Sequence, residues 1–396
     1  MEKEFVKIYE NAIYLQDLQT AAEHTIGIDE LRGSTILVTG ATGTIGSFIV
    51  DMLANYFHDK VSGIGTTTSI VVCGRSERKL RDRFDHYNAI NADEAGSRIL
   101  YAQIDILERE SFDKLPDLQV DYVIHAAGNA YPSAFVDHPD ETVYGNIAGT
   151  YKLLQYAALH GCHKFLYISS GEVYSLSEEE REHWKKEYIS GDLDRYLLKV
   201  SRTVDIKGAR ASYPVSKAAA EALCLLYLEK EMDKAGSEME TLVVRPCHTF
   251  GPGITDGDDR AHVQFAKMAI AGQDIVLNSP GLQLRSYNYV ADAAAGIVSA
   301  MLADRASDGG DFTDRVVDIC SEDNIITIRG LAQLIADKAK VTLKTKEADS
   351  REKSLSSPIS TQVLNPEDLK KIGFKKAFTL DEGMSHYIDI LLGIKT

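Results

Sequence analysis

Short apolar runs separated by amphipathic segments divide the first two thirds of the chain. An amphipathic helix is predicted over residues 4–24, where apolar side chains recur at roughly helical spacing. Apolar strands are predicted at STILVTG (34–40), SIVVCG (69–74), RILYAQID (98–105), DYVIHAA (121–127), KFLYISS (164–170) and METLVVRP (239–246). Helical segments separate most of these strands. Short apolar strands that alternate with helices predict an α/β fold with a doubly wound parallel sheet.

A glycine-rich turn, VTGATGTIG, follows the first of these strands and opens a helix. It places Gly40, Gly43 and Gly46 where the backbone must turn tightly, with Thr44 and Ile45 at the helix start. Glycines at these positions let a pyrophosphate approach the free N–H groups of a helix N-terminus. The strand–turn–helix context therefore predicts a Rossmann-type dinucleotide site.

The residues after the second strand bear on which dinucleotide binds. NAD sites normally carry an acidic residue there that hydrogen-bonds the adenosine ribose, whereas this chain reads VVCGRSERK. Arg75, with Lys79 one turn on, suits the 2′-phosphate of NADP, or else is a solvated arginine at a helix start. Asp105, which ends the third strand before Ile106, contacts the adenine or caps a helix. The cofactor is therefore expected to be NAD or NADP.

Changes in the pattern set the expected domain boundaries. Residues 1–33 form a helical N-terminal extension, and residues 34–250 form the dinucleotide-binding domain. A charged insertion at residues 175–208 contains the single tryptophan, Trp184. After residue 250 the chain becomes more irregular, so residues 251–396 are expected to form a smaller substrate-binding lobe with parts of the cofactor domain interleaved.

Composition narrows the class of protein. The 396 residues carry a formal charge of −16 and no basic block, which disfavours nucleic acid as a partner. No apolar run reaches the roughly 20 residues of a membrane span, and the charged N-terminus lacks the apolar core of a signal peptide. Neither a disulfide framework nor a metal site is expected, because the five cysteines are scattered without a CxxC pair. A cytoplasmic protein is predicted.

Two further motifs carry candidate chemistry. Tyr213 and Lys217 form a YxxxK pair whose spacing places both side chains on one helical face. An ammonium group at Lys217 is expected to hold the nicotinamide ribose and to lower the pKa of Tyr213, which makes the phenol a usable base. The stretch SSGEVYS ends the fifth strand and contributes Ser170 and Glu172. Glu172 either transfers protons or has a structural role, in which it caps a turn or pairs with an arginine.

Together these motifs resemble the extended short-chain dehydrogenase/reductase family, specifically its NAD-dependent epimerase/dehydratase group. The resemblance runs from about Thr35 to about Leu302 and implies a nucleotide-sugar substrate and a homodimer. It implies a catalytic set of Ser170, Tyr213 and Lys217. The segments HAAG and NIAGT would lie near the cofactor, through Ala126, Ala127, Gly128 and Asn146.

Within that group, the segments GARASYPVSK, VVRPCHTFGPG and LRSYNYVAD are most similar to UDP-glucuronate decarboxylases and dTDP-glucose 4,6-dehydratases. The resemblance implies that Arg285 binds the diphosphate, for which a guanidinium is well shaped. Arg210 and Arg260 either bind the same anion or a sugar carboxylate, or form surface ion pairs. His248 stands where an amide is usual, and a neutral imidazole can replace that donor. His125 is expected to be structural.

The sequence also departs from the family pattern in ways that bear on the reaction. A 4-keto sugar formed by Tyr213 can be reduced again (C4 epimerisation), can lose water, or can lose carbon dioxide if it is a uronate. Plain epimerases generally lack the carboxylate at Glu172, and dehydratases often have an aspartate where this chain has Gly171. Gly253 replaces a frequent arginine, and Ser175 replaces a glycine. A decarboxylase-like reaction is favoured over dehydration; an epimerase, a net NADPH-dependent reductase and a non-catalytic binding protein remain alternatives.

Overall fold

The computed structural model describes residues 7–58, 67–89, 96–115, 117–174, 210–231, 239–255, 257–303, 315–347, 359 and 361–394. The predicted charged insertion at residues 175–208, with Trp184, lies outside these residues.

Seven parallel strands form the main sheet, in the order β10-β6-β5-β4-β1-β2-β3. The strands are β1 (Thr35–Thr39), β2 (Thr68–Gly74), β3 (Ser97–Gln103), β4 (Tyr122–His125), β5 (Lys164–Ile168), β6 (Glu240–Pro246) and β10 (Val316–Ile319). The order reverses between β1 and β4, and this switch point is where doubly wound sheets bind dinucleotides. The predicted fold class is therefore confirmed, and β10 is a strand that the sequence did not predict.

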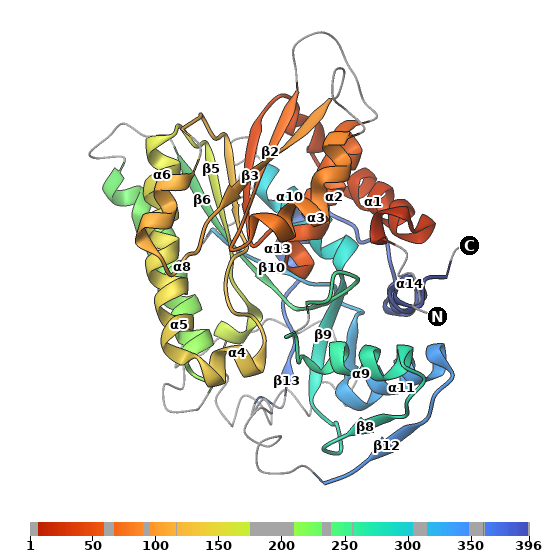
Figure 1. The fold of residues 1–396 in the computed structure, drawn as a ribbon. Helices are drawn as coiled ribbons and strands as arrows, with labels where there is room; N and C mark the ends of the chain where they lie inside the picture. The colour runs from red at the N-terminus through yellow and green to blue at the C-terminus, as the bar shows by residue number, and fades with distance from the viewer. Residues whose placement is uncertain are drawn as a thin grey trace.

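Helices cover both faces of the main sheet (Figure 1). One face carries α2 (Thr44–His58), α3 (Glu77–Ala89) and α10 (Val290–Leu302); the other carries α4 (Pro132–Asp137), α5 (Pro139–Tyr144), α6 (Thr150–Leu159) and α8 (Ser212–Glu231). Successive strand residues alternate between these faces. Leu37 and Phe165 pack with the cluster under α6 and α8, whereas Ile36 and Leu166 belong to the opposite cluster. Burial on both faces explains the continuous apolar runs of the sequence.

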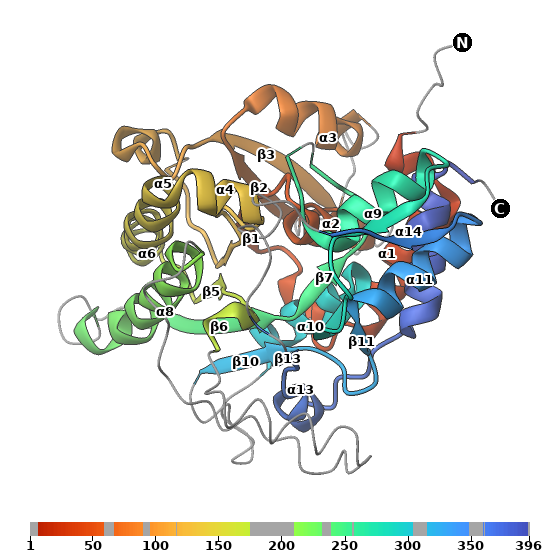
Figure 2. The ribbon, with the colours of Figure 1, turned by 90° about the horizontal axis from the view of Figure 1, so that it is seen from below.

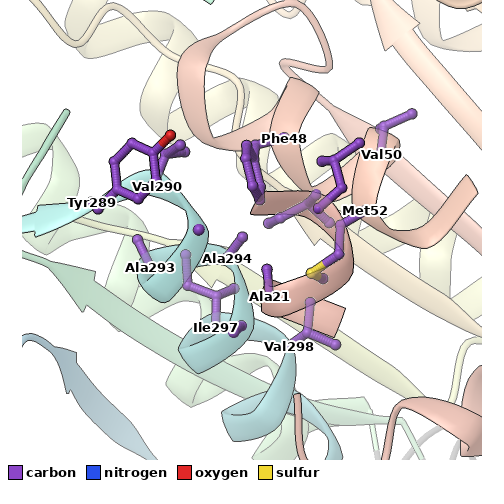
Figure 3. Close-up of a cluster of buried hydrophobic side chains, with 14 of the residues drawn as sticks. Ala21, Phe48, Val50, Met52, Tyr289, Val290, Ala293, Ala294, Ile297 and Val298 are labelled. Carbon is purple, nitrogen blue, oxygen red and sulfur yellow. The ribbon is translucent and has the colours of Figure 1, made fainter. Parts of the chain in front are cut away.

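The N-terminal extension contains helix α1 (Ala12–His24), which Asn11 caps by accepting hydrogen bonds from the backbone of Ile13 and Tyr14. The helix packs against α2 and α10 of the same chain. Figure 3 shows this contact, with Ala21 near Val298 and Met52. The N-terminal extension therefore docks on its own chain.

The remaining elements form a smaller assembly at one end of the main sheet (Figures 1 and 2). Strand β9 (Leu284–Tyr289) pairs with β7 (His248–Phe250), β11 (Ile325–Thr327) and β13 (Thr361–Gln362), and β8 (Ile275–Leu277) pairs with β12 (Leu343–Thr345). The helices are α9 (Ala261–Ile270), α11 (Ile328–Ala339) and α14 (Leu380–Leu391). Helix α13 (Glu367–Lys371) packs instead beside β10 of the main sheet. Strand β10 and helix α10 also follow residue 250, but they join the main sheet and its helical layer.

Over the described ranges, no helix combines the length and the apolar character needed to cross a lipid bilayer. The same residues contain no group of three or more His, Cys, Asp or Glu side chains placed to hold a metal ion. All five cysteines are buried free thiols.

Candidate active site

The phosphate loop joins β1 to α2 through a turn that only glycine accommodates. Gly40 has a φ of +65°, and a Cβ there would lie 2.6 Å from the carbonyl oxygen of Ala126. A Cβ on Gly46 would meet the carbonyl oxygen of Gly40. The turn therefore brings bare backbone and the N-terminus of α2, at Thr44 and Ile45, to the wall of a large cavity.

That cavity has a volume of about 1330 Å³ and runs from the phosphate loop to the small sheets. It is lined by every residue proposed from the sequence for catalysis, cofactor binding or substrate binding: Gly40, Gly43, Thr44, Ile45, Gly46, Arg75, Asp105, Ile106, Ala126, Ala127, Gly128, Asn146, Ser170, Glu172, Arg210, Tyr213, Lys217, His248, Arg260 and Arg285. Residues separated by up to 245 positions thus share one cavity, although their individual roles stay predictions.

At the end of β2, Arg75 and Lys79 are exposed and line the cavity. The amide of Gln103 donates to the Arg75 carbonyl oxygen at 3.1 Å, which fixes the backbone of this turn. Just after β3, Asp105 accepts the backbone N–H of Leu107 at 3.0 Å. Asp105 therefore caps a turn, whereas the helix cap that was one of its two expected roles is not formed; it also lines the cavity.

Asn146 lies deep in the cavity, on a π-helical turn (Gly145–Gly149) between α5 and α6. Such turns recur at functional sites. The Asn146 amide nitrogen donates to Ser216 Oγ at 2.9 Å, while its Oδ1 is buried with no protein partner among the described residues. This oxygen faces Gly128, where a Cβ would lie only 2.8 Å from it. A buried acceptor without a partner is costly, so the site suits a ligand that donates a hydrogen bond.

The YxxxK pair lies at the start of α8, beside the end of β5. Lys217 is 4% exposed, and its ammonium donates to the carbonyl oxygen of Ile168 at 2.8 Å. The ring of Tyr213 stacks on Phe135 with 4.9 Å between centroids. Ser170 Oγ accepts the backbone N–H of Glu172 at 3.1 Å, and Ser170 is also a hydrogen-bond partner of Tyr213.

The protonation of this pair differs from the sequence-based expectation. Burial lowers the pKa of Lys217 to about 8. Burial also raises the pKa of Tyr213 to about 12, and the charge of Glu172 adds to the increase. Lys217 had been expected to lower the phenol pKa, but its Nζ lies 5.9 Å from the Tyr213 ring centroid and is directed to Ile168. Desolvation therefore outweighs the effect of the lysine in this structure.

Glu172 pairs with Arg210, whose Nη2 lies 3.1 Å and 3.5 Å from the two carboxylate oxygens. The Arg210 guanidinium also lies over the ring of Phe135, 4.8 Å from its centroid. Pairing with an arginine was one of the structural roles expected for Glu172. Both side chains nevertheless line the cavity beside Tyr213, so the ion pair also leaves the carboxylate within the candidate active site.

The other two arginines differ in how their charge is compensated. Arg260 forms an ion pair with Asp258 at 2.5 Å, and its Nη2 also lies 3.4 Å from Thr44 Oγ1 of the phosphate loop. Arg285 is 3% exposed and donates to the carbonyl oxygens of Leu284 and Ile359. Within the part of the chain that the structure describes, Arg285 has no ion pair with a carboxylate. A buried cation without a counter-charge suits an anionic ligand.

Two histidines lie in environments that favour the neutral imidazole. Burial, followed by the charge of Arg285, holds the pKa of His248 well below its usual range, so its imidazole is neutral. His125 is buried, and its two ring nitrogens lie 2.7 Å from Thr39 Oγ1 and 3.0 Å from Thr150 Oγ1. Burial lowers the pKa of His125 to about 3.

Several residues at the site were not predicted from the sequence. Glu221, Arg245 and Ser169 form a buried cluster behind the YxxxK pair. Glu221 follows Lys217 by four positions, so the periodicity of the motif was a signal that could have identified it. Asp258, the partner of Arg260, precedes it by two positions, so this proximity was also a signal. No short-range signal pointed to Leu364 beside Gly171.

The chain was compared with known proteins. Residues 36–313 match the model of the NAD dependent epimerase/dehydratase family. The chain is 26% identical over 277 residues to UDP-glucuronic acid decarboxylase 1 of Xenopus tropicalis, covering 69% of this chain and 55% of that protein. It is 28% identical over 266 residues to UDP-N-acetyl-alpha-D-glucosaminuronate decarboxylase of Bacillus cytotoxicus, covering 67% of this chain and 70% of that protein.

Among solved structures, the fold is similar to that of Thermus thermophilus UDP-glucose 4-epimerase in complex with NAD. The TM-score is 0.64 at 20% identity, over 91% of this chain and 99% of that one. At this identity the likeness supports the fold alone.

Proposed function

Because the chain belongs to the NAD-dependent epimerase/dehydratase family, we propose that it modifies a nucleotide sugar through a 4-keto intermediate, in the manner of a UDP-glucuronate decarboxylase. The observation that carries the proposal is the shared cavity, in which Glu172 joins Ser170, Tyr213 and Lys217. The curated relatives reported above are decarboxylases of nucleotide-linked uronates, which supports the same choice.

The residues present fit a dinucleotide. The bare backbone at Gly40 and the N-terminus of α2 suit the pyrophosphate. Gly128 and the free Oδ1 of Asn146 line the cavity, and Lys217 suits the ribose. When bound, the nicotinamide would accept a hydride from C4 of the sugar and return it later.

The chain's own side chains account for the proton transfers. Tyr213, with Ser170 beside it, takes the proton of the sugar C4 hydroxyl. Because burial raises the phenol pKa, this role requires a nearby positive charge, which the oxidised nicotinamide would supply when bound. In the resulting β-keto acid the C5–C6 bond breaks, carbon dioxide leaves, and the electron pair moves onto the C4 oxygen as an enolate. C5 of the enolate then gains a proton, and Glu172 is the carboxyl group available to deliver one that it has taken up from solvent. When the hydride returns to C4, Tyr213 gives the proton back to the C4 oxygen. Arg285 holds the diphosphate, and neutral His248 offers a hydrogen bond without adding charge.

The surroundings of Gly171 support decarboxylation over dehydration. Dehydration requires an acid to protonate the departing C6 hydroxyl, and dehydratases of this family often carry an aspartate at this position. A Cβ on Gly171 would lie 2.9 Å and 3.0 Å from the two methyl carbons of Leu364. Leu364 therefore fills the space that a side chain at position 171 would need. The acid that dehydration requires is also absent there.

A substrate panel tests the reaction. We expect UDP-glucuronate, or a related nucleotide uronate, to lose the mass of carbon dioxide when incubated with the protein and a dinucleotide. Loss of water from dTDP-glucose would indicate a dehydratase, and an isomer of unchanged mass would indicate an epimerase. Consumption of a stoichiometric amount of NADPH would indicate a net reductase. Failure to convert any UDP-, dTDP-, CDP- or GDP-sugar would contradict the enzymatic proposal.

The end of β2 makes NADP a specific second candidate for the cofactor. Arg75 and Lys79 line the cavity, and the nearby Glu77 is paired with Arg81 at 2.7 Å. If these cations bind a 2′-phosphate, NADP should bind more tightly than NAD by calorimetry, and Arg75→Ala should remove the difference. Arg78→Ala is the matched control, because Arg78 is exposed on the same helix but does not line the cavity. Tighter binding of NAD would assign it as the cofactor.

We also propose a homodimer formed through α6 and α8, in a cytoplasmic setting that keeps the five buried thiols reduced. These helices lie on the same side of the main sheet (Figure 1). They expose Tyr151 (44%), Leu159 (83%) and Leu226 (54%). We further propose that residues 34–250 provide the cofactor site and that residues 251–396 cover the substrate.

A further inference from the structure

A buried ion pair lies directly behind the proposed catalytic residues. Glu221 is 5% exposed, and Arg245 donates to both of its carboxylate oxygens, at 2.9 Å and 2.6 Å. The same carboxylate accepts the hydroxyl of Ser169 at 2.5 Å. A two-pronged arginine–carboxylate pair fixes both groups in orientation as well as distance.

This pair contacts both ends of the turn that carries Ser170 and Glu172. At one end, Glu221 holds Ser169. At the other end, the Arg245 guanidinium lies over the ring of Tyr174, 4.5 Å from its centroid. The Tyr174 hydroxyl in turn donates to Asp318 of β10 at 2.8 Å. Residues 169–174 are thus anchored at both ends to one ion pair.

Glu221 is also placed to act on Lys217. It follows Lys217 by four residues on α8, so the two side chains lie on one face of the helix. The titratable groups that face Lys217 are His125 on β4, Tyr167 on β5, and Tyr213, Glu221 and Cys224 on α8. Among these described groups Glu221 is the only carboxylate. His125 is neutral, so Glu221 provides the negative charge that favours the ammonium form in a buried site.

We propose that Glu221, held by Arg245, is a positioning residue that orients the Ser169–Tyr174 turn and keeps Lys217 protonated. The inference rests on the proposed function for its catalytic meaning, since that function assigns the roles of Ser170, Glu172 and Lys217. Its physical content, the coupling of Glu221 to Lys217, does not depend on which substrate is converted.

Competitive acetylation tests the coupling without any substrate. The full chain is treated with trace acetic anhydride across a pH series, and the acetylation of Lys217 is quantified by peptide mass spectrometry. We expect a midpoint near pH 8 in the natural chain. In Glu221→Gln the midpoint should fall by about one unit, because a neighbouring negative charge is lost. Asp292→Asn is the control, since Asp292 is an equally buried carboxylate that caps the backbone of Ala377 and Phe378 away from the cavity.

An unchanged Lys217 midpoint in folded Glu221→Gln overturns the inference. If that variant does not fold by circular dichroism, Glu221→Asp decides, because it keeps the charge and shortens the reach. This variant should keep the midpoint and lower kcat at least tenfold with little change in KM, and a wild-type kcat overturns the positioning role. If the natural chain converts no nucleotide sugar while the midpoint shift is present, the proposed function fails and the coupling stands.

Discussion

Glu172 is the residue on which the choice of reaction depends, and its contacts set a clear expectation. Its carboxylate pairs with Arg210 yet faces the cavity beside Tyr213. We predict that Glu172→Gln binds the dinucleotide as the natural chain does, since no cofactor contact is removed, but slows turnover by about 10²–10⁴-fold, the usual contribution of a positioned acid or base. Calorimetry and product formation measure the two effects.

Glu110→Gln is the control for that substitution, because Glu110 is an exposed glutamate away from the cavity. Turnover by Glu172→Gln at the natural rate would show that pairing with Arg210 is the only role of Glu172.

The contact of Gly171 with Leu364 makes a second residue-level prediction. Gly171→Asp should lower the free energy of unfolding by about 1–3 kcal/mol, the usual cost of overpacking a filled site, and should not produce dehydratase activity. In a Leu364→Ala background the same substitution should cost less, because the methyl groups that block the side chain are gone. Urea unfolding of the four proteins measures the difference, and equal costs in the two backgrounds would refute the steric explanation.

At the level of elements, α1 is connected to the small sheet and to α14 by titratable groups. Asp17 on α1 is fully buried; it accepts the hydroxyl of Tyr289 on β9 at 2.5 Å and lies 2.7 Å from His386 Nδ1 on α14. The hydrogen bond to Asp17 raises the pKa of His386 above its usual value. The folded protein therefore stabilises the imidazolium form of His386 relative to the unfolded chain.

The sign of the pH effect follows from this pKa shift. A raised pKa in the folded state gives stability that is fully present below the unfolded value near 6.5 and is lost as the pH rises through the folded pKa. In the natural chain, Tm should therefore fall as the pH rises above about 6.5. We predict that His386→Gln removes this part of the pH dependence. Thermal unfolding in a pH series measures it. Parallel Tm curves for the two proteins would contradict the role of the Asp17–His386 pair.

Local pattern was sufficient for six of the seven strands of the main sheet, but not for β10 or for the contacts between elements. The six strands predicted were continuous apolar runs, because the sheet is buried on both faces. The phosphate loop was recognisable because Gly40 and Gly46 admit no side chain. Strand β10 is only four residues long, and the pair formed by Glu221 and Arg245 joins α8 to β6. Such long-range pairings leave no periodic signal in the sequence.

At the scale of the whole molecule, the exposed apolar side chains of α6 and α8 predict its oligomeric state. Leu159→Glu combined with Leu226→Glu should give a monomer, because two charges would be buried in the proposed dimer contact. Light scattering coupled to size-exclusion chromatography measures the mass. Leu282→Glu, at a side chain that is 74% exposed elsewhere, should leave the mass unchanged. A natural chain that is monomeric at micromolar concentration would refute the proposal.

Helix α1 has a consequence for how the molecule unfolds. Its Tyr14 donates to the buried Asp51 of α2 at 2.5 Å, and Arg83 of α3 pairs with the same carboxylate. Three residues further along α1, Asp17 holds β9 and α14. Loss of structure on either side would therefore leave a buried polar group of α1, Tyr14 or Asp17, without its partners. We expect the cofactor-binding and substrate-covering parts to melt as one cooperative unit, with a single calorimetric transition.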